Sequence, residues 1–308
     1  MLRAFFVHLS ENRTLRNFAE RSSIGRRVSG RFVAGTEIAD AVRATQVVNA
    51  AGMSVSIDNL GENVTNPDEA RHSAQLYHQI LEAIAANKLN ANISLKLTHM
   101  GLDVDESLAR KLVSDLVVKA ASMTPPGFVR VDMEGSPYTQ RTLDFVHELH
   151  RMPGNGNSVG TVIQAYLKRS EKDVENLLSE RIRIRLCKGA YKEPASIAFE
   201  SKADVDGNYI KLMKTLMKSS VYHGLATHDE NIVREAEAFA KKEKIAPEAF
   251  EFQMLYGIRR DLQQRLVREG WRVRVYIPFG TEWYPYFMRR LGERPANVFF
   301  IMKNMLRA

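Results

Sequence analysis

Residues 284–297 read YPYFMRRLGERPAN and place two adjacent arginines between a tyrosine and a glutamate. In a helix, Tyr286, Arg289, Arg290 and Glu293 fall at positions i, i+3, i+4 and i+7 and share one face. Alone, the pattern is typical of a solvated helix face with an Arg–Glu pair. Adjacent guanidinium groups also suit a carboxylate, because each offers a planar fork of donors. The pattern therefore leaves two interpretations open, a solvated surface or a carboxylate clamp.

A second set of polar residues follows eight short apolar runs, close to the point where each run ends. A single polar residue there can cap a helix or shape a loop. Polar groups at the end of every run are harder to explain in this way, because the charged ones among them need partners or a ligand, so the pattern predicts an active site. The set comprises Asp58, Glu62, Lys96, Thr98, His99, Asp132, Glu134, Gln164, Arg185, Lys188, Tyr191, Thr227, His228, Gln253, Tyr256 and Tyr276.

Several of these residues allow more than one kind of chemistry. Lys96 could be a Schiff-base nucleophile, a fixed positive charge paired with Asp132, or part of a structural ion pair. No HExxH-like spacing surrounds His99 or His228, so we expect hydrogen-bonded neutral histidines and no metal. Cys187 lies within an apolar run without an identifiable base, which favours packing over nucleophilic catalysis. No GxGxxG motif opens a strand–helix unit, which argues against a Rossmann-type dinucleotide site.

The elements that must position these residues alternate along the chain. Each apolar run is followed by a helical pattern, which predicts parallel strands joined by helices. Eight such units in about 250 residues predict a (β/α)8 barrel rather than a doubly wound open sheet, with the active site at the carboxyl ends of the strands. The predicted strands lie at 53–62, 92–101, 128–135, 158–167, 181–191, 222–229, 250–257 and 271–280; the helices lie at 68–88, 105–121, 138–151, 170–179, 203–218, 229–242 and 258–269.

Local signals suggest where two flanking helices begin and end. Thr36 can cap a helix whose inner side carries Ile38, Val42 and Val47/Val48. Pro285 suits the first turn of the helix after the last strand. Pro295 predicts that this helix ends near residue 294.

Composition limits the class of protein. With 308 residues, 44% of them hydrophobic and 26% charged, the sequence predicts one catalytic domain over 1–308, divided into an N-terminal helical arm (1–31) and a barrel with C-terminal helices (32–308). No apolar run reaches the length of about 18 residues that a membrane-spanning helix needs. The single cysteine excludes a disulfide framework. A net charge of +8, without a zinc-finger or RNP-type motif, does not predict nucleic-acid binding.

Several strings at the strand ends, taken together, resemble the proline dehydrogenase family. The strings ISLKLTHMGLD, VDMEG, RLCKGAY, LATHD, FQMLYG, VYIPFG and YFMRRLGERPAN match in order and spacing, from about residue 31 onward. The length resembles the monofunctional bacterial enzyme. The resemblance implies a distorted (β/α)8 barrel that binds FAD and oxidises L-proline to Δ1-pyrroline-5-carboxylate by hydride transfer to flavin N5. Electrons would pass to a membrane quinone, and a separate pyrroline-5-carboxylate dehydrogenase would be a partner.

The resemblance also implies roles for individual residues. Lys96, Asp132 and Arg185 would be the catalytic set, and Glu62 would gate the site by pairing with Arg289. Substrate would contact Lys96, Tyr191, Leu255, Tyr276, Tyr286, Arg289 and Arg290. Flavin would contact Asp132, Gln164, Arg185, Cys187, Lys188, Thr227, His228, Gln253 and Glu293. The sequence departs from the family pattern at His99, Cys187 and Lys192, none of which belongs to the expected carboxylate clamp.

The resemblance and the chain ends bear on where the protein acts, and the sequence leaves other functions open. The resemblance implies a cytoplasmic enzyme. The apolar and basic character of residues 1–31 and of the C-terminal ANVFFIMKNMLRA fits either peripheral contact with the inner face of an anionic plasma membrane or packing of terminal helices. Competing functions are another flavin barrel such as a methylenetetrahydrofolate reductase, a Schiff-base aldolase using Lys96, and a basic barrel that binds nucleic acid or lipid.

Overall fold

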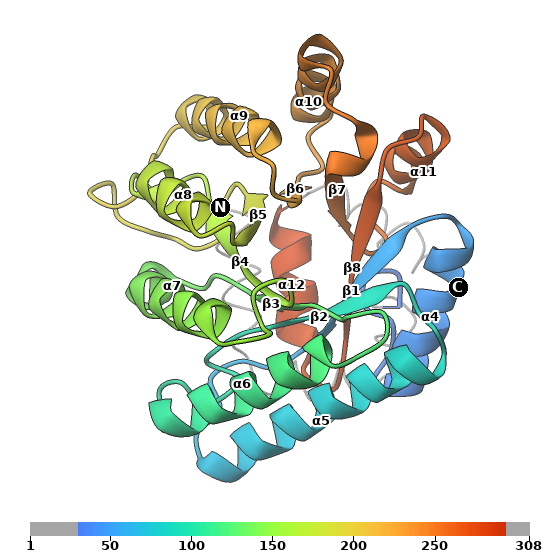
Figure 1. The fold of residues 1–308 in the computed structure, drawn as a ribbon, viewed down its shortest axis with the longest axis vertical. Coiled ribbons are helices and arrows are strands. Elements are labelled where there is room, and N and C mark those ends of the chain that lie inside the picture. Colours follow the sequence, from blue (N-terminus) through green and yellow to red (C-terminus); the bar gives the residue numbers. More distant parts are fainter. Residues whose placement is uncertain (1–29, 294–308) are drawn as a thin grey trace.

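The computed structural model describes residues 30–293, with side chains up to residue 288. In this part of the chain, eight parallel strands form a closed barrel in the order β1 to β8, surrounded by helices (Figure 1). Seven strands fall within their predicted runs, and β2 begins one residue before its run, so the (β/α)8 prediction is confirmed. The strands are β1 (Ser54–Asn59), β2 (Ala91–Leu95), β3 (Val129–Val131), β4 (Val159–Gln164), β5 (Arg183–Cys187), β6 (His223–Ala226), β7 (Phe250–Leu255) and β8 (Val273–Phe279).

The connecting helices occupy the predicted intervals to within a few residues. They are α4 (Ile38–Ala50), α5 (Pro67–Ala86), α6 (Glu106–Ala121), α7 (Ser136–Arg151), α8 (Ser170–Ser179), α9 (Lys202–Lys218), α10 (Glu230–Glu243), α11 (Arg260–Arg268) and α12 (Trp283–Glu293), with a 3₁₀ turn, η1, at Pro247–Ala249. Side-chain caps explain several of the helix starts. Asn66, Asp105 and Ser201 each accept a hydrogen bond from a backbone N–H of the first helical turn.

Two local predictions at α4 were wrong. Glu37, and not Thr36, occupies the N-cap position of this helix. The carboxylate of Asp40 accepts hydrogen bonds from the backbone N–H groups of Thr36 and Glu37, so a side chain inside the helix secures its start. Val47 is 71% exposed, whereas Val48 is buried, because Ala41, Thr45 and Val48 form the inner face of the helix.

The strands divide their side chains between two environments. Alternate positions such as Val55, Ile57, Ile93 and Leu95 are fully buried in the apolar layer of the main core. The positions between them face the barrel interior and are largely polar. Because parallel strands place residues of equal register side by side, Ser56 pairs with Tyr276 where β1 meets β8 and closes the barrel. The interior therefore holds a polar network, and the hydrophobic core lies outside the sheet.

Helix α12 lies across the barrel opening when the molecule is viewed as in Figure 1. Its buried residues Trp283, Tyr286 and Phe287 form a second apolar cluster with Leu60 and Ile258. Leu60 follows β1 and Ile258 follows β7, so the helix packs at the carboxyl ends of the strands. Pro285 lies in the first turn, as predicted.

Other predictions fall outside the described part of the chain. Arg289, Arg290 and Glu293 belong to the backbone of α12, but their side chains are not among those described. The expected arm at 1–31 lies almost entirely outside the described residues, as does the C-terminal tail. Among residues 30–293, no helix has the length and apolar character needed to span a membrane.

Candidate active site

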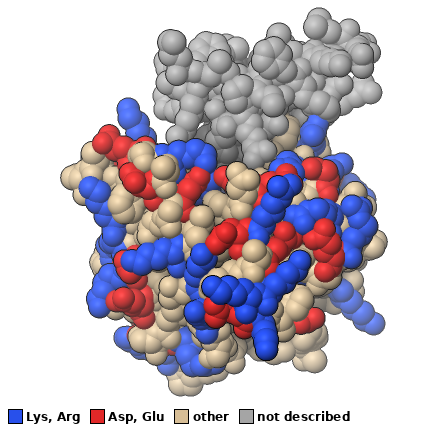
Figure 2. Space-filling model, turned by 90° about the horizontal axis from the view of Figure 1, so that it is seen from above, with Lys and Arg blue, Asp and Glu red and all other residues tan. Residues whose placement is uncertain are grey.

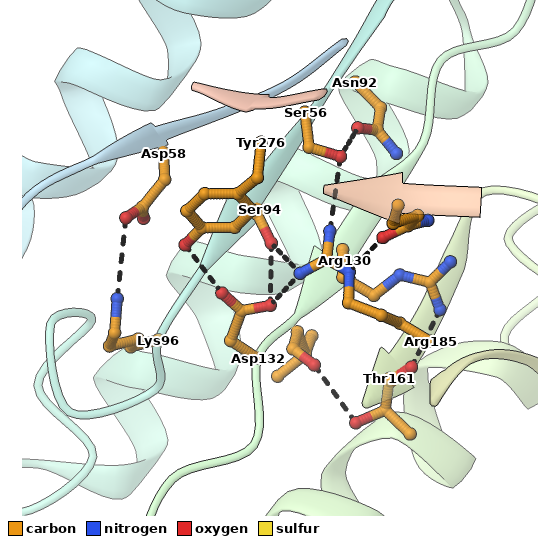
Figure 3. A network of polar contacts seen from close by, with 12 residues as sticks. Ser56, Asp58, Asn92, Ser94, Lys96, Arg130, Asp132, Thr161, Arg185 and Tyr276 are labelled. Carbon is orange, nitrogen blue, oxygen red and sulfur yellow. Dashed lines mark hydrogen bonds and ion pairs between the residues drawn. The ribbon is translucent and has the colours of Figure 1, made fainter. Parts of the chain in front are cut away.

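Asp132, which follows β3, lies at the centre of the polar network inside the barrel (Figure 3). Its Oδ1 accepts hydrogen bonds from Ser94 Oγ at 2.7 Å and from Arg185 Nη1 at 2.7 Å. Its Oδ2 accepts a hydrogen bond from the Tyr276 hydroxyl at 2.9 Å. These partners come from β2, β5 and β8, so one carboxylate links strands on different sides of the barrel. The ion pair between Asp132 and Arg185 is buried, and several hydrogen bonds fix its geometry at once.

Arg185 extends from β5 into the same network. Its Nε donates to Gln253 Oε1 at 2.5 Å, and its Nη2 donates to Ser56 Oγ at 3.2 Å. Its Nη1 also donates to Ser94 Oγ at 3.1 Å, and the guanidinium lies 5.2 Å from the centre of the Tyr276 ring. Four of the five guanidinium N–H groups are thus used, and one Nη2–H has no acceptor among the described residues.

Lys96 and Asp58 form a separate ion pair at the carboxyl ends of β2 and β1. The distance from Lys96 Nζ to Asp58 Oδ2 is 3.6 Å, too long for a direct hydrogen bond. Asp58 Oδ1 accepts instead from the Tyr77 hydroxyl at 3.2 Å. Of the alternatives for Lys96, direct pairing with Asp132 is not formed, since Asp132 is engaged by Arg185 and Asp58 is the carboxylate beside Lys96.

The charge of Lys96 is stabilised by its surroundings. Burial by itself lowers the pKa of Lys96, but the negative charges of Asp58, Glu62 and Asp132 outweigh this effect and hold the pKa above its usual value. Burial raises the pKa of Asp58 to about 6, although Lys96 acts in the opposite direction. An ammonium with a raised pKa is a poor nucleophile, which argues against the Schiff-base interpretation.

Further polar groups line the ends of β3 and β4. Glu134 accepts hydrogen bonds from the backbone N–H and the hydroxyl of Thr98, and burial raises the pKa of this carboxyl. Gln164 Nε2 donates to the backbone carbonyl of Glu134 at 2.9 Å. This bond fixes the orientation of the amide and leaves Gln164 Oε1 as an acceptor at the end of β4.

The ends of β5, β6 and β7 bring a third group of predicted residues together. His228 Nε2 accepts a hydrogen bond from the backbone N–H of Leu255 at 2.9 Å, which requires that this nitrogen carry no proton. Thr227 Oγ1 accepts from the backbone N–H of Asp229. Lys188 Nζ lies 2.5 Å from Asp206 Oδ1 and 2.9 Å from Asp229 Oδ2, so in this structure the lysine is engaged by two carboxylates.

The remaining predicted residues lie around this centre. Cys187 ends β5, and burial raises the pKa of its thiol to about 12, which leaves it protonated at neutral pH. Tyr191 is 37% exposed, and Leu255 packs against the apolar cluster that contains Tyr286. Glu62 is exposed after β1. Its expected pairing with Arg289 cannot be traced, because that side chain lies outside the described residues.

Metal chemistry has no obvious centre in this part of the molecule. Between residues 30 and 293, no three His, Cys, Asp or Glu side chains are grouped so that they could hold an ion. Burial lowers the pKa of His99 to about 3, which keeps the imidazole neutral beside Lys96.

Sequence reasoning missed the interior residues below the strand ends. Ser56 lies two residues before Asp58, and Asn92 and Ser94 lie four and two residues before Lys96. Ser56 Oγ donates to Asn92 Oδ1 at 2.5 Å. Glu251 and Arg274 lie two residues before Gln253 and Tyr276, and the two form a buried ion pair at 2.7 Å. The alternation of polar and apolar residues along each strand was the signal that could have found them.

Comparison with known proteins places this site in a family. The sequence model described as "Proline dehydrogenase" matches residues 41–303. Proline dehydrogenase 1 of Bacillus subtilis (strain 168) is 40% identical over 308 residues, 100% of both chains. The proline dehydrogenase of Deinococcus radiodurans is 41% identical over 280 residues, 90% of this chain and 89% of that protein.

A solved structure supports the same relationship. Proline utilization A (PutA) from Bdellovibrio bacteriovorus, inactivated by N-propargylglycine, is 25% identical and superposes with a TM-score of 0.80. The match covers 87% of this chain and 32% of that one, so this chain corresponds to about a third of the larger protein.

The closed barrel and its charged strand ends define an enzyme of the (β/α)8 class, with an active site at the carboxyl ends of the strands. The chain belongs to the proline dehydrogenase family. Proline dehydrogenase activity, the first step of proline catabolism, is the enzyme activity that this membership assigns to it.

Proposed function

We propose that the enzyme binds FAD at the carboxyl ends of the strands, oxidises L-proline to Δ1-pyrroline-5-carboxylate, and delivers the electrons to a membrane quinone. The observation that carries this proposal is that Lys96 is buried and keeps its positive charge. Its side chain is only 12% exposed, its charge is maintained by nearby carboxylates, and none of the described residues accepts a hydrogen bond from its Nζ. A buried ammonium that donates no hydrogen bond to a described residue is suited to bind an anion, and the carboxylate of proline is the strongest handle on that small substrate.

Arg289 and Arg290 would complete the clamp. Their backbone positions lie in the last turns of α12, the helix that crosses the barrel opening (Figure 1). More than one cation is needed to offset the cost of removing a carboxylate from water. Tyr276, Tyr286, Tyr191 and Leu255 would supply the walls around the ring, and Glu62 would act as the gate.

The donor set at the strand ends suits a flavin. Arg185 keeps one Nη2–H free among the described residues, while Gln164 presents an acceptor, and a flavin ring offers both acceptors and an N–H donor. Lys188, Thr227, His228, Gln253, Cys187 and Glu293 are the other residues we assign to FAD. Lys188 would have to exchange a carboxylate partner for a phosphate, because Asp206 and Asp229 engage it here.

The protein's share of the chemistry is positioning and charge. When bound, FAD supplies the hydride acceptor, which no side chain can provide. Asp132 holds Arg185 and Tyr276 in fixed orientations through the bonds described above, and Lys96 holds the substrate carboxylate. The substrate must therefore lie in one orientation, with its reacting carbon held near the acceptor. Substrate amine must be neutral, and we find no dedicated base for it among the described side chains.

Adding proline to the purified enzyme without oxygen tests the proposed function directly. We expect a yellow protein whose flavin absorbance bleaches on addition of L-proline and returns on addition of a soluble quinone. Glycine, which has a carboxylate and an amine but no ring, is the matched control and should leave the absorbance unchanged. A protein that binds no flavin after incubation with FAD, or one that proline does not bleach, would contradict the proposal.

The pH dependence of kcat/KM tests the requirement for a neutral amine. Burial and the charges of Asp132 and Asp58 hold the pKa of Tyr276 well above its usual value, and the pKa of Lys96 is also raised. Neither group titrates as pH rises from 7 to 10, so a rise of kcat/KM across that range would report deprotonation of the substrate amine. Burial raises the pKa of Asp58 to about 6, so ionisation of Asp58 falls on the acid side of the profile, below the range in which the amine is expected to titrate. A flat profile between pH 7 and 10 would refute the requirement.

A further inference from the structure

The opposite end of the barrel carries a hollow of about 640 Å³. Its walls come from the segments that precede β4, β5, β6 and β8, so it opens at the amino ends of the strands, away from the site described above. Four arginines line it: Arg181, Arg183, Arg272 and Arg274. Glu180 is the acidic residue that lines it with them.

Positive charge in this hollow exceeds the negative charge available to it. Glu180 is held by Arg151 and by His147, outside the four arginines. Glu251, which lies behind the hollow inside the barrel, is held by Arg274 at 2.7 Å. Among the described residues, no carboxylate lies within ion-pair distance of the other three arginines. Like charges held together without counter-ions disfavour the folded state unless an anion joins them.

Stacking fixes two of these arginines in place. The Arg183 guanidinium lies 4.2 Å from the centre of the Phe128 ring and 5.0 Å from that of Tyr222. Arg272 lies 5.7 Å from the Tyr222 ring. Arg183 Nε is buried without a hydrogen-bond partner in the described structure. Aromatic contacts orient the guanidinium planes but do not satisfy their N–H donors, so the donors that line the hollow are preorganised for an external acceptor.

The arginines of the hollow repel one another, as the cationic groups of a preformed anion site do. Burial lowers the pKa of Arg183, and although Glu251 acts in the opposite direction, the charge of Arg274 lowers that pKa further. On the face shown in Figure 2, basic and acidic side chains are intermingled, so the described part of that face carries no large patch of one sign. A compact oxyanion would relieve the repulsion between these arginines.

We propose that this hollow binds a small ligand carrying a diphosphate or two closely spaced phosphate groups. Arg181, Arg183 and Arg272 would form its donors, because their guanidinium forks match the geometry of phosphoryl oxygens. A volume of about 640 Å³ admits a metabolite but not a nucleic-acid duplex. This site is independent of the flavin and proline sites, which lie at the other end of the strands.

Calorimetric titration with inorganic pyrophosphate tests the proposal. The full chain is first saturated with FAD, so that pyrophosphate cannot enter the proposed flavin site, and ionic strength is held constant with KCl. The test variant is Arg181→Asn combined with Arg272→Gln. Arg181 has φ = 60°, a conformation that asparagine tolerates, and both residues are exposed, so the fold should be retained. We expect binding about 100-fold weaker than in the unaltered protein, since two charge-assisted hydrogen bonds are lost.

A matched control removes two positive charges elsewhere. Lys111→Gln with Lys172→Gln alters exposed lysines on α6 and α8, away from the hollow, and should leave pyrophosphate binding unchanged. If pyrophosphate binding weakened equally in both double variants, the effect would depend on net charge alone and the proposal would be overturned. Absence of pyrophosphate binding to the unaltered protein would overturn it as well. Citrate separates phosphate from carboxylate chemistry: binding as tight as that of pyrophosphate would overturn the assignment to phosphate. Unfolding temperatures without ligand verify that the variants are folded.

Discussion

Replacing Asp132 by alanine is expected to lower kcat/KM for proline by about 10³-fold and the free energy of unfolding by about 3–5 kcal/mol. The change removes one carboxylate that accepts hydrogen bonds from Arg185, Ser94 and Tyr276. Arg185 is buried, so it would keep its charge without a counter-ion. Both the position of the guanidinium and the stability of the barrel depend on this single group.

Steady-state kinetics and chemical unfolding of the flavin-loaded enzyme measure the two effects. Ser94→Ala is the matched control, because it removes the hydrogen bond from Ser94 Oγ to Asp132 and the one that Ser94 Oγ accepts from Arg185, but leaves the ion pair intact. That variant should lose only about 1–2 kcal/mol of stability. If the two variants behaved alike, Asp132 would be one polar contact among many and not the centre of the network.

Replacing Arg290 by methionine is expected to raise KM for proline by about 100-fold or more while FAD remains bound. Its backbone lies in α12, and the proposed clamp uses its guanidinium to bind the substrate carboxylate. Methionine keeps an unbranched side chain of helix-forming character, so the helix itself should persist. Loss of one fork of donors therefore falls on substrate binding and not on the fold.

Arg268→Met serves as the control for this prediction. Arg268 is an exposed arginine in the last turn of α11, and its loss should not change KM. Lys96→Met provides an independent check, because the same carboxylate is expected to contact Lys96, and KM should again rise. An unchanged KM in Arg290→Met would contradict the proposed carboxylate clamp.

The order of elements could be predicted from the sequence because it depends on local patterns. Apolar runs followed by helical stretches identify each strand, and a cap such as Asn66 or Asp105 marks where the next helix begins. The location of the site followed as well, because parallel strands in a barrel bring their carboxyl ends to one face. Lys96, Asp132, Arg185, Gln253 and Tyr276 therefore had to lie near one another.

The choice of partners within the site could not be predicted. Lys96 lies beside Asp58, and Asp132 lies beside Arg185, because the stagger between strands decides which inward residues share a level. That stagger depends on closure of the whole barrel and is not encoded in any one strand. Val47 shows the same limit on a smaller scale: its neighbour Val48 has the same character, and only packing decides which of them is buried.

The charged interior constrains how sequences of this kind can change over time. A continuous chain of contacts runs from Arg274 through Glu251, Gln253 and Arg185 to Asp132, and so joins the two ends of the barrel. Any single loss leaves an uncompensated group buried, whereas changes that preserve the balance of charge do not. Substitutions at inward positions should therefore accumulate as compensating sets, while the apolar layer outside the sheet can drift one residue at a time.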